Sequence, residues 1–156
     1  MDKLVRTLFS VLIVALALRA AYAILLMGGA MMFRLTGEEL FPIEDQTAYV
    51  LRTVPVSFYV IWTAFVACYL AAAIVVQLRV LWALLLYATG FIMDFALTTR
   101  WFNEIYVDQS YGGAGVLVEN ALNAFDLSII ATLVFLLPLE ARRKREEAST
   151  EDPDQL

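Results

Sequence analysis

Three ionisable side chains stand inside long apolar runs of the chain, where a charge most needs an explanation. They are Arg19, Asp94 and Asp126. Ionisable residues in a hydrocarbon environment usually pair with one another or mark a path for protons or ions. One cation facing two carboxylates is the minimum equipment for exchanging a proton or a cation. The same three residues would also serve as an ion pair that only fixes how the helices pack.

The composition identifies the environment of these residues. The 156 residues are 62% hydrophobic and only 17% charged, with a mean hydropathy of +0.74. A soluble domain is about 45–50% apolar and about 25% charged. A soluble chain of this length has too small a core to bury so much apolar surface. Soluble enzymes, disordered chains and secreted disulfide scaffolds are therefore excluded, and the sequence predicts an integral membrane protein.

The residue types present also limit the chemistry. The chain has no histidine, which excludes imidazole ligands and a histidine general base. A lone Cys68 permits neither an internal disulfide nor a cysteine metal cluster. The lysines, Lys3 and Lys144, stand near the chain ends, so a Schiff-base lysine in mid-membrane is excluded. We expect no catalytic residues, no cofactor, no metal and no nucleic-acid partner.

The apolar runs predict how the chain crosses the membrane. The run from Pro55 to Thr99 has 45 residues. At ~1.5 Å per residue it would form a helix of about 67 Å, twice the ~30 Å hydrocarbon thickness. It must therefore turn back, and Gln77-Leu78-Arg79 is its polar interruption. We predict an all-α integral membrane fold, an antiparallel bundle of four transmembrane helices within residues 1–145, with spans over 8–33, 55–76, 80–99 and 116–139. An acidic cytoplasmic tail, 146–156, would follow.

The basic residues predict the orientation. Four spans place both chain ends on one side of the membrane. That side would carry seven cations, Lys3, Arg6, Arg79, Arg142, Arg143, Lys144 and Arg145. The other side would carry three, Arg34, Arg52 and Arg100. Because basic residues concentrate on the cytoplasmic side, we expect both termini in the cytoplasm, as in a bacterial inner membrane. The run Arg142-Arg143-Lys144-Arg145 would anchor the topology and attract anionic lipid.

Local signals describe the connections between the spans. In the first outer loop, Thr36-Gly37-Glu38-Glu39 fits a capping box, and Asp45 begins a predicted short amphipathic helix that ends at Arg52. In the second, Gly112-Gly113-Ala114-Gly115 predicts a flexible turn. Pro138 marks a predicted end for the last span. The acidic residues after Lys144 predict a segment that is disordered on its own.

Depth arithmetic brings the three buried charges together. At ~1.5 Å per residue from the cytoplasmic end of each span, Arg19 lies about 18 Å deep, Asp94 about 22 Å and Asp126 about 21 Å. Three charges on three helices at one depth predict a polar cluster in the centre of the bundle. Helical spacing places Tyr87, Asp94 and Thr98 on one stripe. We expect Tyr22, Asn123 and Thr63 in the cluster as well. Glu119 and Asn120 either line an outer vestibule or extend towards the membrane surface.

Small residues indicate where helices pack closely. Ala64, Cys68 and Ala72 recur every four residues, as do Ala17 and Ala21. Such spacing lets two membrane helices approach each other.

Three classes of function agree with these features. The first is a small non-catalytic membrane subunit or accessory protein that packs against membrane partners and is stabilised by its polar core. The second is an oligomeric transporter or channel, coupled to protons or cations, that uses Asp94 and Asp126. The third is a membrane enzyme or lipid-binding protein whose interior holds an apolar ligand. We favour the first class, with the lipid bilayer and other membrane subunits or further copies of the chain as partners.

Overall fold

A computed structural model describes residues 3–40, 43, 45–102 and 105–151, and of residues 4, 46, 101–116 and 143–151 in these ranges it describes the backbone alone. The described residues form five helices and no strand. The helices are α1 (Lys3–Thr36), α2 (Asp45–Thr53), α3 (Val56–Val75), α4 (Val80–Phe102) and α5 (Ile105–Glu151). All but α2 contain a segment long and apolar enough to cross a membrane. The predicted all-α bundle of four membrane-spanning helices is confirmed.

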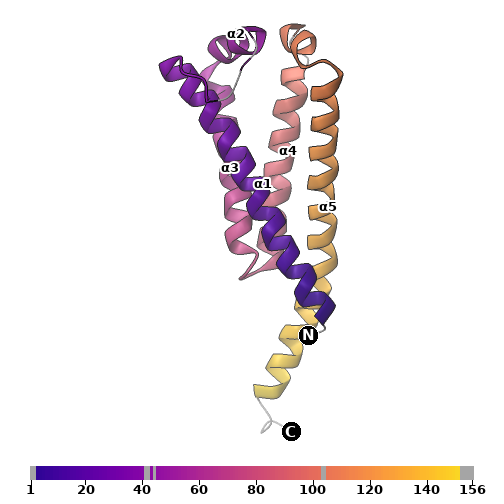
Figure 1. The fold of residues 1–156 in the computed structure, drawn as a ribbon. Helices are drawn as coiled ribbons and strands as arrows, with labels where there is room; N and C mark the ends of the chain where they lie inside the picture. Colours follow the sequence, from indigo (N-terminus) through magenta and orange to yellow (C-terminus); the bar gives the residue numbers. More distant parts are fainter. Residues whose placement is uncertain (1–2, 41–42, 44, 103–104, 152–156) are drawn as a thin grey trace.

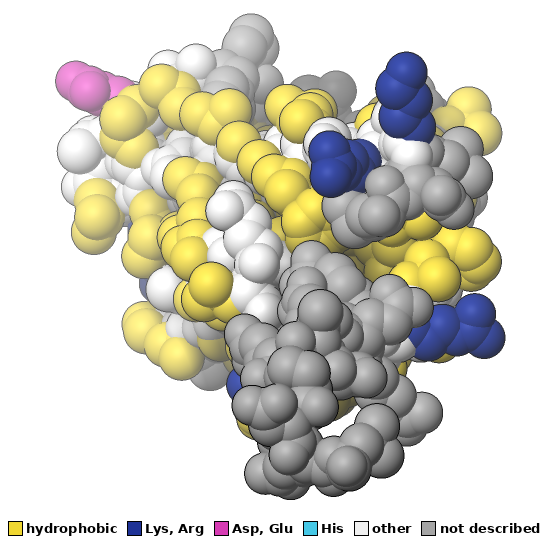
Figure 2. Space-filling view, turned by 90° about the horizontal axis from the view of Figure 1, so that it is seen from below, with side chains coloured by type: hydrophobic (Ala, Val, Ile, Leu, Met, Phe, Trp, Pro, Cys, Tyr) yellow, Lys and Arg dark blue, Asp and Glu magenta, His cyan; other side chains and the backbone are white. Residues whose placement is uncertain are grey.

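The four long helices run up and down beside one another (Figure 1). α3 packs along α4, α1 lies against α3, and α5 lies against α4, whereas α1 and α5 touch much less. The first residues of α1 and the last residues of α5 lie at one end of the bundle, and α2 lies at the opposite end (Figure 1). We call these the terminal end and the α2 end. Figure 2 shows exposed basic side chains at the terminal end. The described residues Lys3, Arg6, Arg79 and Arg142 are exposed.

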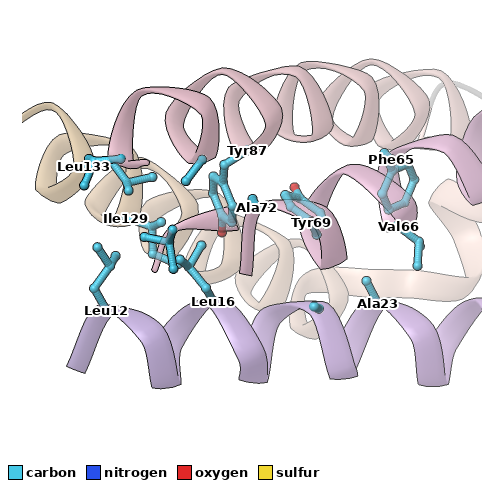
Figure 3. Packing of buried hydrophobic residues seen from close by; sticks show 14 of the residues in the cluster. Leu12, Leu16, Ala23, Phe65, Val66, Tyr69, Ala72, Tyr87, Ile129 and Leu133 are labelled. Carbon is cyan, nitrogen blue, oxygen red and sulfur yellow. The ribbon is translucent and has the colours of Figure 1, made fainter. Parts of the chain in front are cut away.

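One apolar core runs through the middle of the bundle (Figure 3). Its members recur every three or four residues along each helix, the spacing of a helix face that points inward. The buried set includes Leu12, Leu16, Ala20, Ala23, Phe65, Val66, Tyr69, Ala72, Ala83, Tyr87, Ile129 and Leu133. The opposite faces are also apolar, since Leu18, Leu25 and Leu127 are mostly exposed. Helices that are apolar on every side belong in lipid.

The α2 end has a smaller core of its own. Ala30, Phe33, Leu51 and Tyr59 pack together there. Arg34 donates a hydrogen bond of 2.7 Å from Nη1 to the carbonyl oxygen of Val54, beyond the last residue of α2. Its guanidinium also lies 4.7 Å from the centre of the Tyr59 ring. A cation on the last carbonyls of a helix favours its dipole, so Arg34 holds α2 on the bundle.

The predicted capping box at Thr36 is wrong, whereas the predicted helix over 45–52 is present as α2. Thr36 is the last residue of α1, and Gly37 follows it with φ of 77°. The Gly37 amide donates to the Phe33 carbonyl oxygen at 2.9 Å, the bond of a left-handed helix C-cap. The segment therefore ends one helix instead of beginning another, because only glycine adopts this conformation without strain.

The last helix is longer than predicted at both ends. The glycine-rich segment 112–115 and Pro138 both lie inside α5, so the predicted flexible turn and helix stop are wrong. Residues 146–151, predicted to be disordered on their own, continue α5 as helix. Adding a residue to an existing helix avoids the cost of nucleation, and this stretch contains three glutamates and an alanine, which favour helix.

Candidate functional site

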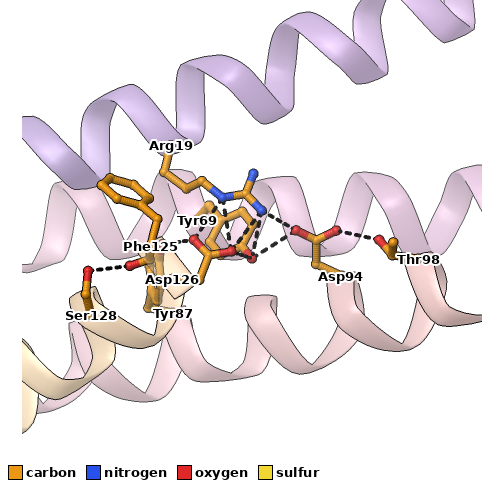
Figure 4. Close-up of polar contacts among 8 residues, drawn as sticks. All are labelled: Arg19, Tyr69, Tyr87, Asp94, Thr98, Phe125, Asp126 and Ser128. Carbon is orange, nitrogen blue, oxygen red and sulfur yellow. Dashed lines mark hydrogen bonds and ion pairs between the residues drawn. The ribbon is translucent and has the colours of Figure 1, made fainter. Parts of the chain in front are cut away.

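A fork of hydrogen bonds joins Arg19 on α1 to Asp126 on α5 in the centre of the bundle (Figure 4). Arg19 Nε donates to Asp126 Oδ1 at 2.9 Å and Nη2 donates to Oδ2 at 3.0 Å. The Arg19 side chain is 6% exposed and that of Asp126 is 1% exposed. Two parallel charge-assisted bonds fix both the distance and the angle of a guanidinium–carboxylate pair. This pair is therefore the rigid centre of the site, and it links α1 to α5, which otherwise touch little.

Asp94 on α4 binds the other side of the same guanidinium. Its Oδ2 accepts a hydrogen bond of 2.5 Å from Arg19 Nη2. Its Oδ1 faces Thr98, one turn along α4, whose hydroxyl lies at 3.5 Å. The Asp94 side chain is 17% exposed, against 1% for Asp126. Asp94 is therefore the carboxyl that lies nearer to the outside of the protein.

Two tyrosines complete the network. The Tyr87 hydroxyl donates to Asp126 Oδ1 at 2.5 Å. The Tyr69 hydroxyl lies 3.1 Å from Asp94 Oδ2 and 3.4 Å from Asp126 Oδ2. The Tyr69 ring also stacks under Arg19, with its centre 4.6 Å from the guanidinium carbon. A cation over a desolvated aromatic ring gains about 2 kcal/mol. We call Arg19, Tyr69, Tyr87, Asp94 and Asp126 the polar core; its members come from all four spanning helices.

The close approach of α3 and α4 positions the tyrosines. A Cβ atom on Gly90 would lie 3.1 Å from Cys68 Cβ and 3.3 Å from Tyr69 Cδ1. The absence of a side chain at Gly90 therefore lets Tyr69 lie against α4, one helical turn from Asp94. The predicted small-residue seam of α3 includes Cys68 and faces α4 in this way. The seam of α1 does not face inward, since Ala17 and Ala21 are exposed.

Only some of the residues predicted for the cluster lie in it. Arg19, Asp94 and Asp126 are brought together. Tyr22 lies beside them, with its ring centre 5.9 Å from the Arg19 guanidinium carbon and its side chain partly exposed. Thr63 does not belong to the cluster, because it is exposed and donates to the Tyr59 carbonyl of its own helix at 2.8 Å.

The remaining predicted residues lie around the polar core rather than in it. Asn123 is half-buried, and among the described residues it makes no hydrogen bond to the core. Glu119 is also half-buried, and it lies near Thr98 and within electrostatic range of Asp94 and Arg19. Asn120 is exposed. Of the predicted basic anchor, Arg142 is exposed, and the side chains of Arg143, Lys144 and Arg145 lie outside the described part.

The sequence did not lead us to predict Tyr69 in the cluster, and it placed Tyr87 only on the same helix face as Asp94. The available signal was a tyrosine well inside a span, far from the membrane surface where this residue type usually lies. A buried tyrosine hydroxyl needs a partner. Tyr69 and Tyr87 both meet that need at the carboxylates, and no buried side-chain nitrogen or oxygen of the described residues is without a hydrogen-bond partner.

The polar core contains one guanidinium, two carboxyl groups and two phenol hydroxyl groups, which can hold charge and protons. No group of three metal-ligating side chains is found in the described part of the chain. The fold and the site together define an integral membrane four-helix bundle with an ionic centre. Comparisons with family models, curated proteins and solved structures find no match to this chain.

Proposed function

We propose that the protein is a small non-catalytic subunit or accessory protein of a membrane complex, and that the polar core locks its four spans into a rigid block. The observation that carries this proposal is the closure of the network. Every spanning helix contributes to it, and the described buried polar atoms are all partnered. A network satisfied in this way specifies one arrangement of the helices. A catalytic site would instead leave polar groups free for a substrate.

The outer face of α1 supports packing against another membrane protein. Ala17, Ala21 and Gly28 lie on one lipid-facing side of this helix. A Cβ atom on Gly28 would meet nothing within 4 Å. Small residues on an exposed membrane helix allow a second helix to approach its backbone. The partner we propose for this face is therefore a transmembrane helix of another subunit.

The proposed location is a bacterial inner membrane with the terminal end in the cytoplasm. The basic side chains around this end support the orientation by the positive-inside rule. Bilayer lipid would cover the other apolar faces. The basic run after Glu140 would rest on anionic headgroups, and we propose no nucleic-acid partner and no cofactor.

Site-specific photo-crosslinking at native expression tests the proposal. A photoreactive residue at Ala21 should yield one defined heterologous adduct. The matched control is Ala131, an equally small and exposed residue of α5, which should yield only lipid adducts. The proposal would be refuted if Ala21 gave no protein adduct, or the same set of adducts as Ala131.

A second candidate is an oligomeric transporter or channel coupled to protons or cations. The observation that favours it is the excess of carboxylates, since Asp94 and Asp126 face a single arginine. Its signature would be adducts of Ala21 only with further copies of the chain, together with proton or cation flux in liposomes. Flux that disappears in Asp94→Asn would move the assignment to this class.

A further inference from the structure

The carboxyl groups around the polar core outnumber its positive charges. Asp94 and Asp126 both contact Arg19, which is the one cation among the described residues of the core. Glu119 lies within electrostatic range of all three. If both aspartates were ionised, the buried core would carry a net negative charge. An unbalanced charge inside a membrane is costly, so the core should retain a proton.

The hydrogen-bond donors identify which carboxyl holds that proton. Asp126 receives the two-bond fork from Arg19 and the hydroxyl of Tyr87. Several donors, one of them charged, stabilise an ionised carboxylate. Asp94 Oδ1, by contrast, faces only the hydroxyl of Thr98, at the long distance of 3.5 Å. The Asp94 Oδ1 atom is therefore the carboxyl oxygen of the core best placed to carry a hydrogen.

The hydroxyl groups near Asp94 support the same assignment. Thr98 is placed between Asp94 and Glu119, but its hydroxyl has one hydrogen and can donate to only one of them. A protonated Asp94 resolves this conflict, because it can donate to Thr98 and so leave the Thr98 hydrogen for Glu119. The Tyr69 hydroxyl likewise lies near both Asp94 and Asp126 but has one hydrogen to donate. It can therefore satisfy only one ionised carboxylate, which agrees with a core that holds one proton.

Access to this proton is one-sided. Towards the terminal end, the polar core is followed by buried apolar side chains such as Leu16 and Leu133, each with 0% exposure (Figure 3). Towards the α2 end, Asp94 is followed by Thr98 and the half-buried Glu119. The polar route therefore leads from Asp94 to the α2 end and stops at the apolar layer on the other side.

We infer that Asp94 is a proton-binding site that exchanges its proton with the α2 side of the membrane through Thr98 and Glu119, while Asp126 pairs with Arg19. The proton comes from water at the α2 end and binds Asp94 Oδ1, and it leaves by the same route. A metal cation does not fit, because Arg19 Nη2 lies 2.5 Å from Asp94 Oδ2 and would repel it. The ligand class is thus the proton alone.

The titratable and charged groups that face Asp94 come from all the packed helices. They are Arg19 and Tyr22 on α1, Tyr69 on α3, Tyr87 on α4, and Glu119 and Asp126 on α5. Protonation neutralises Asp94 and leaves Arg19 balanced by Asp126. Deprotonation leaves one excess negative charge in the polar core, which weakens the packing of α4 against the other helices. The site is therefore suited to report proton concentration on one side of the membrane.

Infrared spectroscopy of the full chain in lipid nanodiscs tests the assignment. At neutral pH the wild type should show the C=O stretch of a protonated, buried carboxyl. Asp94→Asn should remove this band and Glu119→Gln should not, and Thr98→Val should shift its frequency because the Thr98 hydroxyl faces Asp94 Oδ1. The assignment is wrong if the band is absent, if it survives Asp94→Asn, if Glu119→Gln removes it, or if Thr98→Val leaves its frequency unchanged. Asparagine resembles a protonated aspartate in shape and charge, so a failure of Asp94→Asn to fold would also count against the assignment.

Deuterium exchange of the same band tests the route. Thr98→Val and Glu119→Gln should slow the isotope shift after transfer to D₂O on the order of a hundredfold, the lower end of what a positioned proton-transfer group contributes. Thr89→Val is the matched control, because Thr89 is exposed on the same helix and donates to its own helix at Leu85. It should leave the exchange rate unchanged. Equal rates in all three variants would refute the route.

Discussion

Replacing Asp126 with asparagine should cost the bundle much more stability than the same replacement at Asp94. Asp126 Oδ1 and Oδ2 each accept an N–H of Arg19, at 2.9 and 3.0 Å. Either orientation of an asparagine amide at this position points its NH₂ group at an N–H of Arg19. The change therefore removes the negative charge of Asp126 that pairs with Arg19. It also places two hydrogen-bond donors, the asparagine NH₂ and an Arg19 N–H, against each other.

The magnitude follows from the burial of the pair. Breaking one partner of a buried ion pair costs about 3–5 kcal/mol. Interhelical hydrogen bonds in membranes average only about 0.6 kcal/mol, because unfolded helices also find partners there. We take the lower end, about 3 kcal/mol for Asp126→Asn, or roughly a hundredfold in the unfolding equilibrium.

The same change at Asp94 should cost about 1 kcal/mol or less. An amide oxygen at the position of Oδ2 still accepts from Arg19 Nη2 and from Tyr69. The amide NH₂ then faces the hydroxyl of Thr98, which accepts it.

Unfolding by titration of SDS into mixed micelles, followed by tryptophan fluorescence, measures both changes. Trp62 is a suitable reporter, because its ring packs 5.6 Å from that of Phe58 and 6.1 Å from that of Tyr59. Ser128→Ala is the control on α5, since Ser128 is exposed and bonds its own helix; it should stay within about 0.5 kcal/mol. Equal losses for the two asparagine variants would refute the unequal roles assigned to the aspartates.

Three further changes test other parts of the structure. Gly90→Ala should destabilise the same transition by about 1–3 kcal/mol, because its Cβ would press on Cys68; an unchanged midpoint would contradict the close helix contact. With Cys68 replaced by alanine, Glu38→Cys should react with impermeant maleimide outside intact cells and Ser149→Cys should not; labelling at 149 would overturn the orientation. Arg34→Leu should speed hydrogen exchange of the α2 amides with little effect on α4, and uniform protection would show that Arg34 does not hold α2.

The four-helix bundle was predictable because the apolar runs that indicate its spans are long and do not depend on the exact helix ends. Apolar length and the polar interruption before Val80 indicated the number of spans and the turn between the second and third. Helix ends were less predictable. Gly112–Gly115 and Pro138 are residues that permit a break without requiring one, and α5 continues through both. In a membrane environment the backbone gains more from staying hydrogen-bonded than from exposing its polar groups at a turn.

The charged part of the site was predictable for a similar reason. A charge in hydrocarbon must find a partner at its own depth, so counting residues was enough to bring Arg19 to both aspartates. Thr63 shows where that reasoning fails, because a threonine hydroxyl satisfies itself on the preceding turn of its helix. Depth therefore predicts the partners of charged groups better than those of hydroxyl groups.

Tyr69 and Tyr87 show what depth counting lacks. A tyrosine in an apolar run has the pattern of a core residue, and its hydroxyl reaches well beyond its own Cα, so the depth of the backbone does not give the depth of the polar atom. Both rings start on the terminal side of Asp94 and bring their hydroxyls to the carboxylates. The two rings also contact each other, with centres 4.9 Å apart. Tyr87 therefore gives Asp126 a neutral donor that Asp94 lacks, whereas Tyr69 lies within reach of both carboxyl groups, and this distinguishes the two aspartates.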